Sequence, residues 1–212
     1  MKSKLIIAMI AIMIFAMAGE SYGQFYYGLK AGGTLATQAQ VGTLWDNSGL
    51  RQGFNLGAFG GYSFNESLSV QTELRFQEKG MRYDYMNNEG SFRVLRKYDY
   101  VNIPVLLKGS LTEKSGLPQS WSIYAYTGPY AGIQVYSKDL FTNGHPQETS
   151  GISDTSASPD FGAVLGAGVS KKISNGHEIF FEISYEMGLV KIDNQNPDNR
   201  NKAAEASIGF RF

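Results

Sequence analysis

Apolar and polar residues alternate with a period of two in eight segments of the chain. In the clearest segment one face is almost wholly apolar, and it carries Leu68, Val70, Thr72, Leu74 and Phe76. The other face of this segment is polar, and such alternation predicts a β-strand with two unlike faces. The eight segments span residues 25–36, 54–64, 68–77, 101–108, 122–135, 161–170, 178–187 and 205–212. Segment 122–135 is apolar or aromatic on both faces, so its orientation stays open.

The connections between these segments alternate in length. Tight or moderate turns are expected at 65–67, 111–120 and 174–177, and longer loops at 37–52, 84–97, 136–159 and 190–202. An up-and-down barrel with short periplasmic turns and long outer loops gives this alternation, and bacterial barrels have an even number of strands. Each segment has about 10 residues or a little more, as a tilted membrane strand requires. Pro104 and Pro129 fall inside strands and require a bulge or a local break in pairing.

The direction of the apolar faces decides between two classes of barrel. A soluble, lipocalin-like carrier would turn them inward around a hydrophobic ligand, whereas a membrane barrel turns them toward lipid. The polar faces hold Gly, Ser, Gln and a few charges of both signs, unlike a solvated surface. Aromatic residues gather at segment ends, as in interfacial girdles: Phe25, Tyr26, Tyr27, Phe64, Trp121, Tyr136, Phe161 and Phe212. We therefore expect an all-β fold, an eight-stranded antiparallel up-and-down transmembrane β-barrel.

Composition and the first residues narrow the cellular location. The 212 residues include 19 Lys+Arg, 19 Asp+Glu and no Cys, which excludes disulfides and gives no electrostatic case for nucleic acid. Lys2 and Lys4 precede an apolar run, 5–18, that is too short to span a bilayer. We expect residues 1–23 to be a signal peptide and residues 24–212 to be the barrel domain, located in the outer membrane.

Charged residues on the polar faces predict a network inside the barrel. Eight strands leave an interior that side chains just fill, and buried charges have to be paired. The residues expected in this network are Lys30, Glu73, Arg75, Lys108, Glu182, Glu186, Glu205 and Arg211. We expect these residues to form a polar plug, so that the barrel conducts little or no ion current.

Candidate chemistry is sparse, and the sequence predicts no catalytic centre, cofactor site or metal site. The rival enzyme hypothesis is a lipid-modifying barrel in which His145 pairs with Ser150 or Ser153, although a solvated loop histidine explains His145 more simply. Four basic residues near the second outer loop could meet anionic lipid head groups or a glycan phosphate: Arg82, Arg93, Arg96 and Lys97. Segment 136–159 is the expected recognition surface for a protein or glycan partner.

The segment Tyr100–Lys108, with its Ile-Pro pair and Leu-Leu-Lys ending, resembles the PorT-type outer-membrane β-barrel family of Bacteroidetes. Further similar motifs are Gly128-Pro129-Tyr130, Asp160-Phe161-Gly162 and the ending Ser207–Phe212. The resemblance implies an outer-membrane barrel that is folded by the barrel-assembly machinery, which reads the terminal Phe212. From the residues we expect a non-enzymatic barrel in contact with outer-membrane lipid, with a role in binding or membrane integrity. The family is named after a component tied to protein secretion, so an accessory role in secretion is a further hypothesis.

Overall fold

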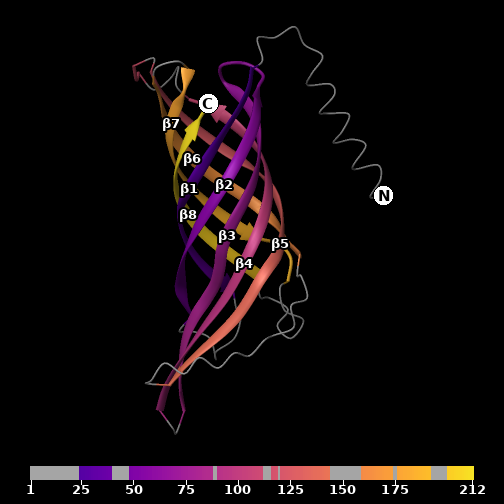
Figure 1. The fold of residues 1–212 in the computed structure, drawn as a ribbon, viewed down its shortest axis with the longest axis vertical. Helices are drawn as coiled ribbons and strands as arrows, with labels where there is room; N and C mark the ends of the chain where they lie inside the picture. Colours follow the sequence, from indigo (N-terminus) through magenta and orange to yellow (C-terminus); the bar gives the residue numbers. More distant parts are fainter. Residues whose placement is uncertain are drawn as a thin grey trace, which may run out of the picture.

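Eight strands form one closed antiparallel barrel, in which each strand pairs with its sequence neighbours and β1 closes against β8 (Figure 1). The computed structural model describes residues 24–39, 48–87, 90–111, 116–118, 120–143, 159–173, 176–191 and 200–212. The strands are β1 (Gln24–Ala39), β2 (Ser48–Ser63), β3 (Leu68–Asn87), β4 (Gly90–Ser110), β5 (Trp121–Asn143), β6 (Pro159–Lys172), β7 (Glu178–Gly188) and β8 (Arg200–Arg211). The predicted eight-stranded up-and-down topology is confirmed. No helix among the described residues is long and apolar enough to cross a bilayer.

The apolar face of each strand points away from the barrel axis. On β3, Leu74 is 59% exposed, whereas its neighbour Arg75 is 1% exposed. The same division holds on β7, where Ile183 lies outside and Glu182 inside. A soluble carrier needs the opposite arrangement, with an apolar interior, so the lipocalin-like alternative is wrong.

The facing of β5, which the sequence left open, is settled by its tyrosines. Tyr124, Tyr126 and Tyr130 are buried inside the barrel, while Ala125 and Ile133 are exposed on its outer surface. The interior side of the neighbouring strand β6 carries glycines. A side chain at Gly166 or Gly168 would collide with the rings of Tyr126 and Tyr124. The small residues of one strand therefore make room for the large residues of the next.

Several strands are longer than the expected membrane span of about 10 residues. They range from 11 residues in β7 to 23 in β5. The expectation of a loop at 84–97 is wrong, because β3 reaches Asn87 and β4 begins at Gly90. The expected loops at 37–52, 136–159 and 190–202 are likewise partly strand.

Strands β3, β4 and β5 continue past the rest of the barrel (Figure 1). At the base of this extension, residues 48–50 of β2 still pair with residues 81–83 of β3. We call the extension the outer sheet and define it as residues 80–87, 90–99 and 136–143. Its base coincides with three irregularities. The β2–β3 register shifts between Leu50 and Asn55, the β4–β5 register shifts between Asp99 and Tyr100, and Gly80 has a φ of 135°. A side chain at Gly80 would strike the backbone carbonyl of Arg96, so only glycine fits this bend.

The two prolines within strands interrupt the barrel wall locally. Pairing between β3 and β4 is absent opposite Pro104, and pairing between β4 and β5 is absent opposite Pro129. The register is the same on both sides of each gap, so these are local breaks and not bulges. The Thr72 hydroxyl donates a hydrogen bond of 3.1 Å to the Pro104 carbonyl. The Thr72 side chain thus supplies a partner for the Pro104 carbonyl oxygen where the strand pairing is interrupted.

The end opposite the outer sheet carries the short turns. In the turn between β2 and β3, the Asn65 side-chain oxygen accepts hydrogen bonds from the amides of Ser67 and Leu68, each 2.8 Å long. Aromatic residues surround this end. Tyr27 stacks on Phe212, and Phe25 packs edge-on against Tyr62. Such a girdle is typical of the membrane–water interface, so we assign this end to the periplasmic side.

Candidate functional site

A continuous line of eight charged side chains runs through the barrel interior, with positive and negative charges alternating. We call it the ion-pair ladder, and its order is Lys108, Glu182, Lys30, Glu73, Arg75, Glu186, Lys79 and Asp160. The links between their nitrogen and oxygen atoms are 2.9, 3.3, 2.8 and 3.7 Å from Lys108 to Arg75, and 2.9 and 3.1 Å from Glu186 through Lys79 to Asp160. Arg75 and Glu186 form the remaining link. The ladder therefore leaves each of its charges next to an opposite one.

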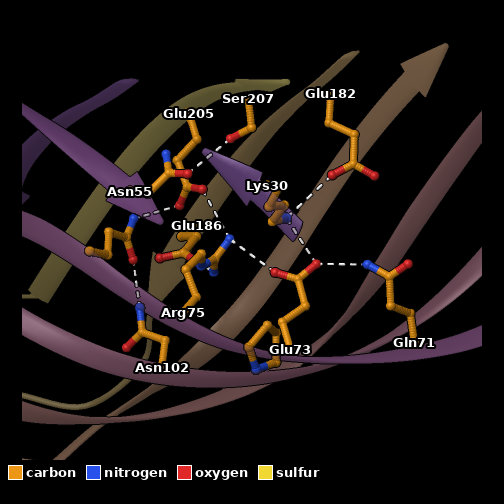
Figure 2. Close-up of polar contacts among 12 residues, drawn as sticks. Lys30, Asn55, Gln71, Glu73, Arg75, Asn102, Glu182, Glu186, Glu205 and Ser207 are labelled. Carbon is orange, nitrogen blue, oxygen red and sulfur yellow. Dashed lines mark hydrogen bonds and ion pairs between the residues drawn. The ribbon is translucent and has the colours of Figure 1, made fainter. Parts of the chain in front are cut away.

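Arg75 is the hub of the ladder. Its guanidinium contacts Glu73 and Glu186 along the ladder and Glu205 as a side branch, the last at 2.9 Å (Figure 2). Alternate residues of β3 point inward, which places Glu73 and Arg75 on the same face. Glu186 and Glu205 come from β7 and β8, across the barrel. A planar guanidinium with five donors is suited to hold several carboxylates at once.

Side-chain amides extend the network between the charges (Figure 2). Gln71 donates to Glu73 at 2.8 Å, and Gln77 donates to Glu205. Asn102 donates in turn to Gln77. The two glutamines donate to carboxylate oxygens, and Asn102 holds Gln77 in place, which lowers the cost of burying the charges.

Tyrosines of β5 cover both ends of the ladder. At one end Lys108 lies 4.2 Å from the ring centre of Tyr124, whose hydroxyl donates to Glu182 at 3.0 Å. At the other end Lys79 lies 4.6 Å from the ring centre of Tyr130, whose hydroxyl donates to Asp160 at 3.1 Å. Lys108 and Lys79 thus each combine ion pairs with a cation–π contact.

The structure brings most of the expected network residues together. Six of them are buried and linked in one network: Lys30, Glu73, Arg75, Glu182, Glu186 and Glu205. Lys108 belongs to the ladder at its edge, with 13% of its side chain exposed. Arg211 does not join, and the expectation that it pairs with one of the four named glutamates is wrong. It pairs with Glu178 at 3.3 Å on the periplasmic rim, where 29% of its side chain is exposed.

Sequence reasoning missed two members of the ladder, Lys79 and Asp160. Lys79 stands at the same two-residue spacing as Glu73, Arg75 and Gln77, so continuing that strand would have found it. Asp160 lies at the first inward position of β6 and receives hydrogen bonds from Lys79, Tyr130 and Asn201. Its partners come from three other strands and depend on register.

The ion-pair ladder fills the interior, and each of its charged side chains is held next to one of opposite charge. Among the described residues, no group of three or more His, Cys, Asp and Glu side chains is placed to hold a metal ion. The proposed enzyme residues His145, Ser150 and Ser153 lie outside the described residues. His177 lies in the β6–β7 turn, where its ring packs against Phe210 at 5.4 Å and Phe212 at 6.0 Å.

The comparisons with known proteins agree with this architecture. The chain matches the family described as outer membrane protein beta-barrel domain over residues 17–194. Among solved structures, it is similar to OprG from Pseudomonas aeruginosa, with 12% identity, a TM-score of 0.51, and coverage of 91% of this chain and 98% of OprG.

Two further solved structures are similar at lower TM-scores. Neisserial surface protein A matches with 16% identity and a TM-score of 0.45, covering 89% of this chain and 97% of that protein. Ail of Yersinia pestis matches with 17% identity and a TM-score of 0.43, covering 89% of this chain and 99% of that protein. No curated protein matches the chain. Because the family match spans most of the sequence, the chain belongs to the outer membrane protein beta-barrel domain family and is a small outer-membrane β-barrel.

Proposed function

We propose that this protein is a closed, non-enzymatic outer-membrane barrel whose functional surface is its outer end. The observation that carries the proposal is the ion-pair ladder, which fills the interior from Lys108 to Asp160. A barrel used as a pore needs a continuous column of water, and buried, paired side chains occupy that volume here. Transport through the interior is therefore not the role of this chain.

The proposed role is binding or membrane integrity, carried out by the outer sheet and the outer loops. The expected recognition segment, 136–159, contributes its first eight residues to β5, and residues 144–158 lie outside the described residues. The strand motifs around Pro104 favour a PorT-type barrel of Bacteroidetes, and an accessory role in protein secretion belongs to this proposal. Strands placed beyond the membrane give a partner a rigid surface to bind.

The proposal includes the route to the membrane. Residues 1–23, which lie outside the described residues, act as a cleaved signal peptide. Phe212, whose ring stacks on Tyr27 at 5.3 Å, acts as the terminal aromatic read by the barrel-assembly machinery. Outer-membrane lipid is then the permanent neighbour of the apolar wall.

Single-channel recording in planar bilayers tests the closed interior. Purified protein is first shown to be folded by its different mobility on a denaturing gel before and after boiling. We expect no stable conductance steps from the folded wild type, because the ladder blocks the water column. Large and stable steps from folded protein would overturn the proposal.

A further inference from the structure

Asp160, at the outer end of the ion-pair ladder, uses only one of its two carboxylate oxygens for contacts with the protein. Its Oδ2 atom accepts hydrogen bonds from Lys79, Tyr130 and Asn201, at 3.1, 3.1 and 3.0 Å. Its Oδ1 atom is buried and has no hydrogen-bond partner among the described residues. A Cβ atom at Gly188 would lie 3.2 Å from this oxygen, so glycine keeps the space beside it open. A buried carboxylate oxygen without a donor is costly, so we expect a bound group next to it.

The neighbours of Asp160 add further oxygens without partners. Asn201 donates to Asp160 through its side-chain nitrogen, and its Oδ1 atom is buried and accepts no hydrogen bond. The hydroxyl of Tyr100 interacts electrostatically with Asp160, and it too is buried without a hydrogen bond. Its single hydrogen can serve only one acceptor. The local arrangement therefore has more acceptors than donors.

Asn102 contributes one more bare oxygen from the same level of the barrel. It lies opposite Gly132 on β5, and Gly132 lies opposite Asp160 on β6. The Oδ1 atom of Asn102 occupies the space where a side chain of Gly132 would stand, and this buried oxygen has no hydrogen-bond partner among the described residues. Asn102 thus leans across β5 toward Asp160. We call four atoms the acceptor site: the Oδ1 atoms of Asp160, Asn201 and Asn102 and the hydroxyl oxygen of Tyr100.

The interior network that the structure describes also has one negative charge in excess. The ion-pair ladder alternates four positive and four negative side chains, and Glu205 adds a fifth carboxylate at Arg75. Hydrogen bonds link this extra carboxylate to the acceptor site, because Asn102 donates to Gln77 and Gln77 donates to Glu205. The amide dipoles of this chain have their negative ends away from Glu205, at Asn102 Oδ1. The excess charge therefore makes the potential at the acceptor site more negative.

We propose that the acceptor site binds one monovalent metal cation, sodium or potassium. Oxygen atoms are the ligands that hard cations take in proteins, and carbonyl oxygens replace the hydration shell of potassium in channels. One positive charge balances the excess carboxylate. Lys79 contacts Asp160 at 3.1 Å, and its ammonium disfavours an ion of higher charge. Water alone would satisfy the oxygens and leave the excess charge without a counter-ion.

Urea unfolding of the protein in vesicles tests the site through the identity of the salt. The solutions contain NaCl, KCl or N-methylglucamine chloride at equal ionic strength, so that screening is the same in all three. A cation that binds only the folded state raises the unfolding midpoint in a saturable way. We expect a higher midpoint in NaCl or KCl than in N-methylglucamine chloride. Equal midpoints in the three salts would overturn the proposal.

Substitutions locate the response at the acceptor site. Asp160→Asn keeps the shape of the side chain and removes its charge, so about tenfold more cation should be needed for the same rise in midpoint. The matched control is Glu178→Gln, which removes a carboxylate at the periplasmic rim and should respond as the wild type does. Asn201→Ser removes a neutral acceptor, should also weaken the response, and replaces Asp160→Asn if that variant does not fold. A wild-type response in both acceptor-site variants would overturn the proposal.

Sodium-23 NMR relaxation of the folded protein in detergent micelles measures the ion directly. We expect the wild type and Glu178→Gln to broaden the sodium signal, potassium to reverse the broadening, and Asp160→Asn to broaden it much less. Equal broadening by the wild type and Asp160→Asn would contradict a site at Asp160. These measurements do not depend on conductance, so they leave the closed interior to its own test.

Discussion

Leu74 and Arg75 are neighbours on β3, and yet their side chains lie in different surroundings, one in lipid and the other inside the barrel. Leu74 points to lipid with 59% of its surface exposed, and Arg75 points to the interior with 1% exposed. The outer surface of the barrel needs only apolar character, because lipid chains adapt to any apolar shape. The inner surface needs specific partners, because a buried charge without one is costly.

The two faces of each strand therefore contribute to the stability of the barrel in different ways. On the outside, contributions come from many small and similar contacts with lipid, and one substitution removes little. On the inside, a few residues such as Arg75 and Glu186 serve several partners each. Substitutions at adjacent positions separate the two surfaces, because the backbone, the strand and the depth in the membrane stay the same.

The largest expected difference is between Arg75→Met and Leu74→Ala. Without Arg75, Glu73 keeps Lys30 and Glu186 keeps Lys79, but Glu205 loses its ion pair. Breaking a buried ion pair costs about 3–5 kcal/mol of unfolding free energy. Leu74→Ala should cost about 1 kcal/mol, since both side chains remain in lipid. Urea unfolding of the protein in vesicles, followed by gel mobility, measures both values.

Equal losses in the two variants would contradict the division between the surfaces. A further variant, Arg75→Met/Glu205→Gln, sharpens the comparison, because it also removes the carboxylate left without a cation. We expect it to recover about 1 kcal/mol or more relative to Arg75→Met alone.

Gly32 and Gly33 allow the inner and outer surfaces to be compared by adding a single methyl group at adjacent positions of β1. A Cβ atom at Gly32 would collide with the carbonyl of Ala206 and with Ser207, whereas a Cβ at Gly33 meets nothing within 4 Å. We expect Gly32→Ala to cost about 1–3 kcal/mol through overpacking. Gly33→Ala should be neutral or stabilising by about 0.4–1 kcal/mol, because it restricts the unfolded chain. The same urea titration measures both, and a destabilised Gly33→Ala would contradict the open space at this position.

The two faces of seven strands could be predicted from the sequence because residue character alternates there. The faces of β5 could not, since Tyr124, Ile123 and Val135 are all compatible with either side; the hydroxyl of Tyr124 distinguishes them only once Glu182 is within reach. The outer sheet was missed for a related reason. Phe92 and Val94 alternate with polar residues, but Leu95 and Arg96 then reverse the pattern. That reversal hides the strand from a reading with a period of two.

The sequence predicted that the interior holds a network of charged residues, but it did not predict which residues pair with each other. Charges on polar faces indicate a network, but partners such as Lys30 and Glu182 are 152 positions apart in the sequence. Their contact depends on the curvature of the barrel and on the register of several strands. Arg211 shows where the prediction from alternation fails. Its position in the alternation places it on the inward face of β8, but it lies at the end of the strand and therefore on the rim of the barrel.

Arg211 also gives the smallest expected effect and the last test of the comparison. Arg75 and Arg211 are the same residue type, both face the inside, and both contact a glutamate. The Arg211 side chain is 29% exposed, pairs with Glu178 at 3.3 Å and contacts the ring of Tyr26. Water screens such a pair, so Arg211→Met should cost about 1 kcal/mol or less.

The salt dependence of unfolding distinguishes the two arginines further. The loss caused by Arg211→Met should shrink at high salt, since exposed ion pairs are screened. The loss caused by Arg75→Met should stay nearly constant, since its partners are buried out of reach of the ions. If the two losses were equal and responded equally to salt, depth in the interior would not determine the strength of these contacts. The ladder would then be a set of independent pairs and not a network whose stability depends on its hub.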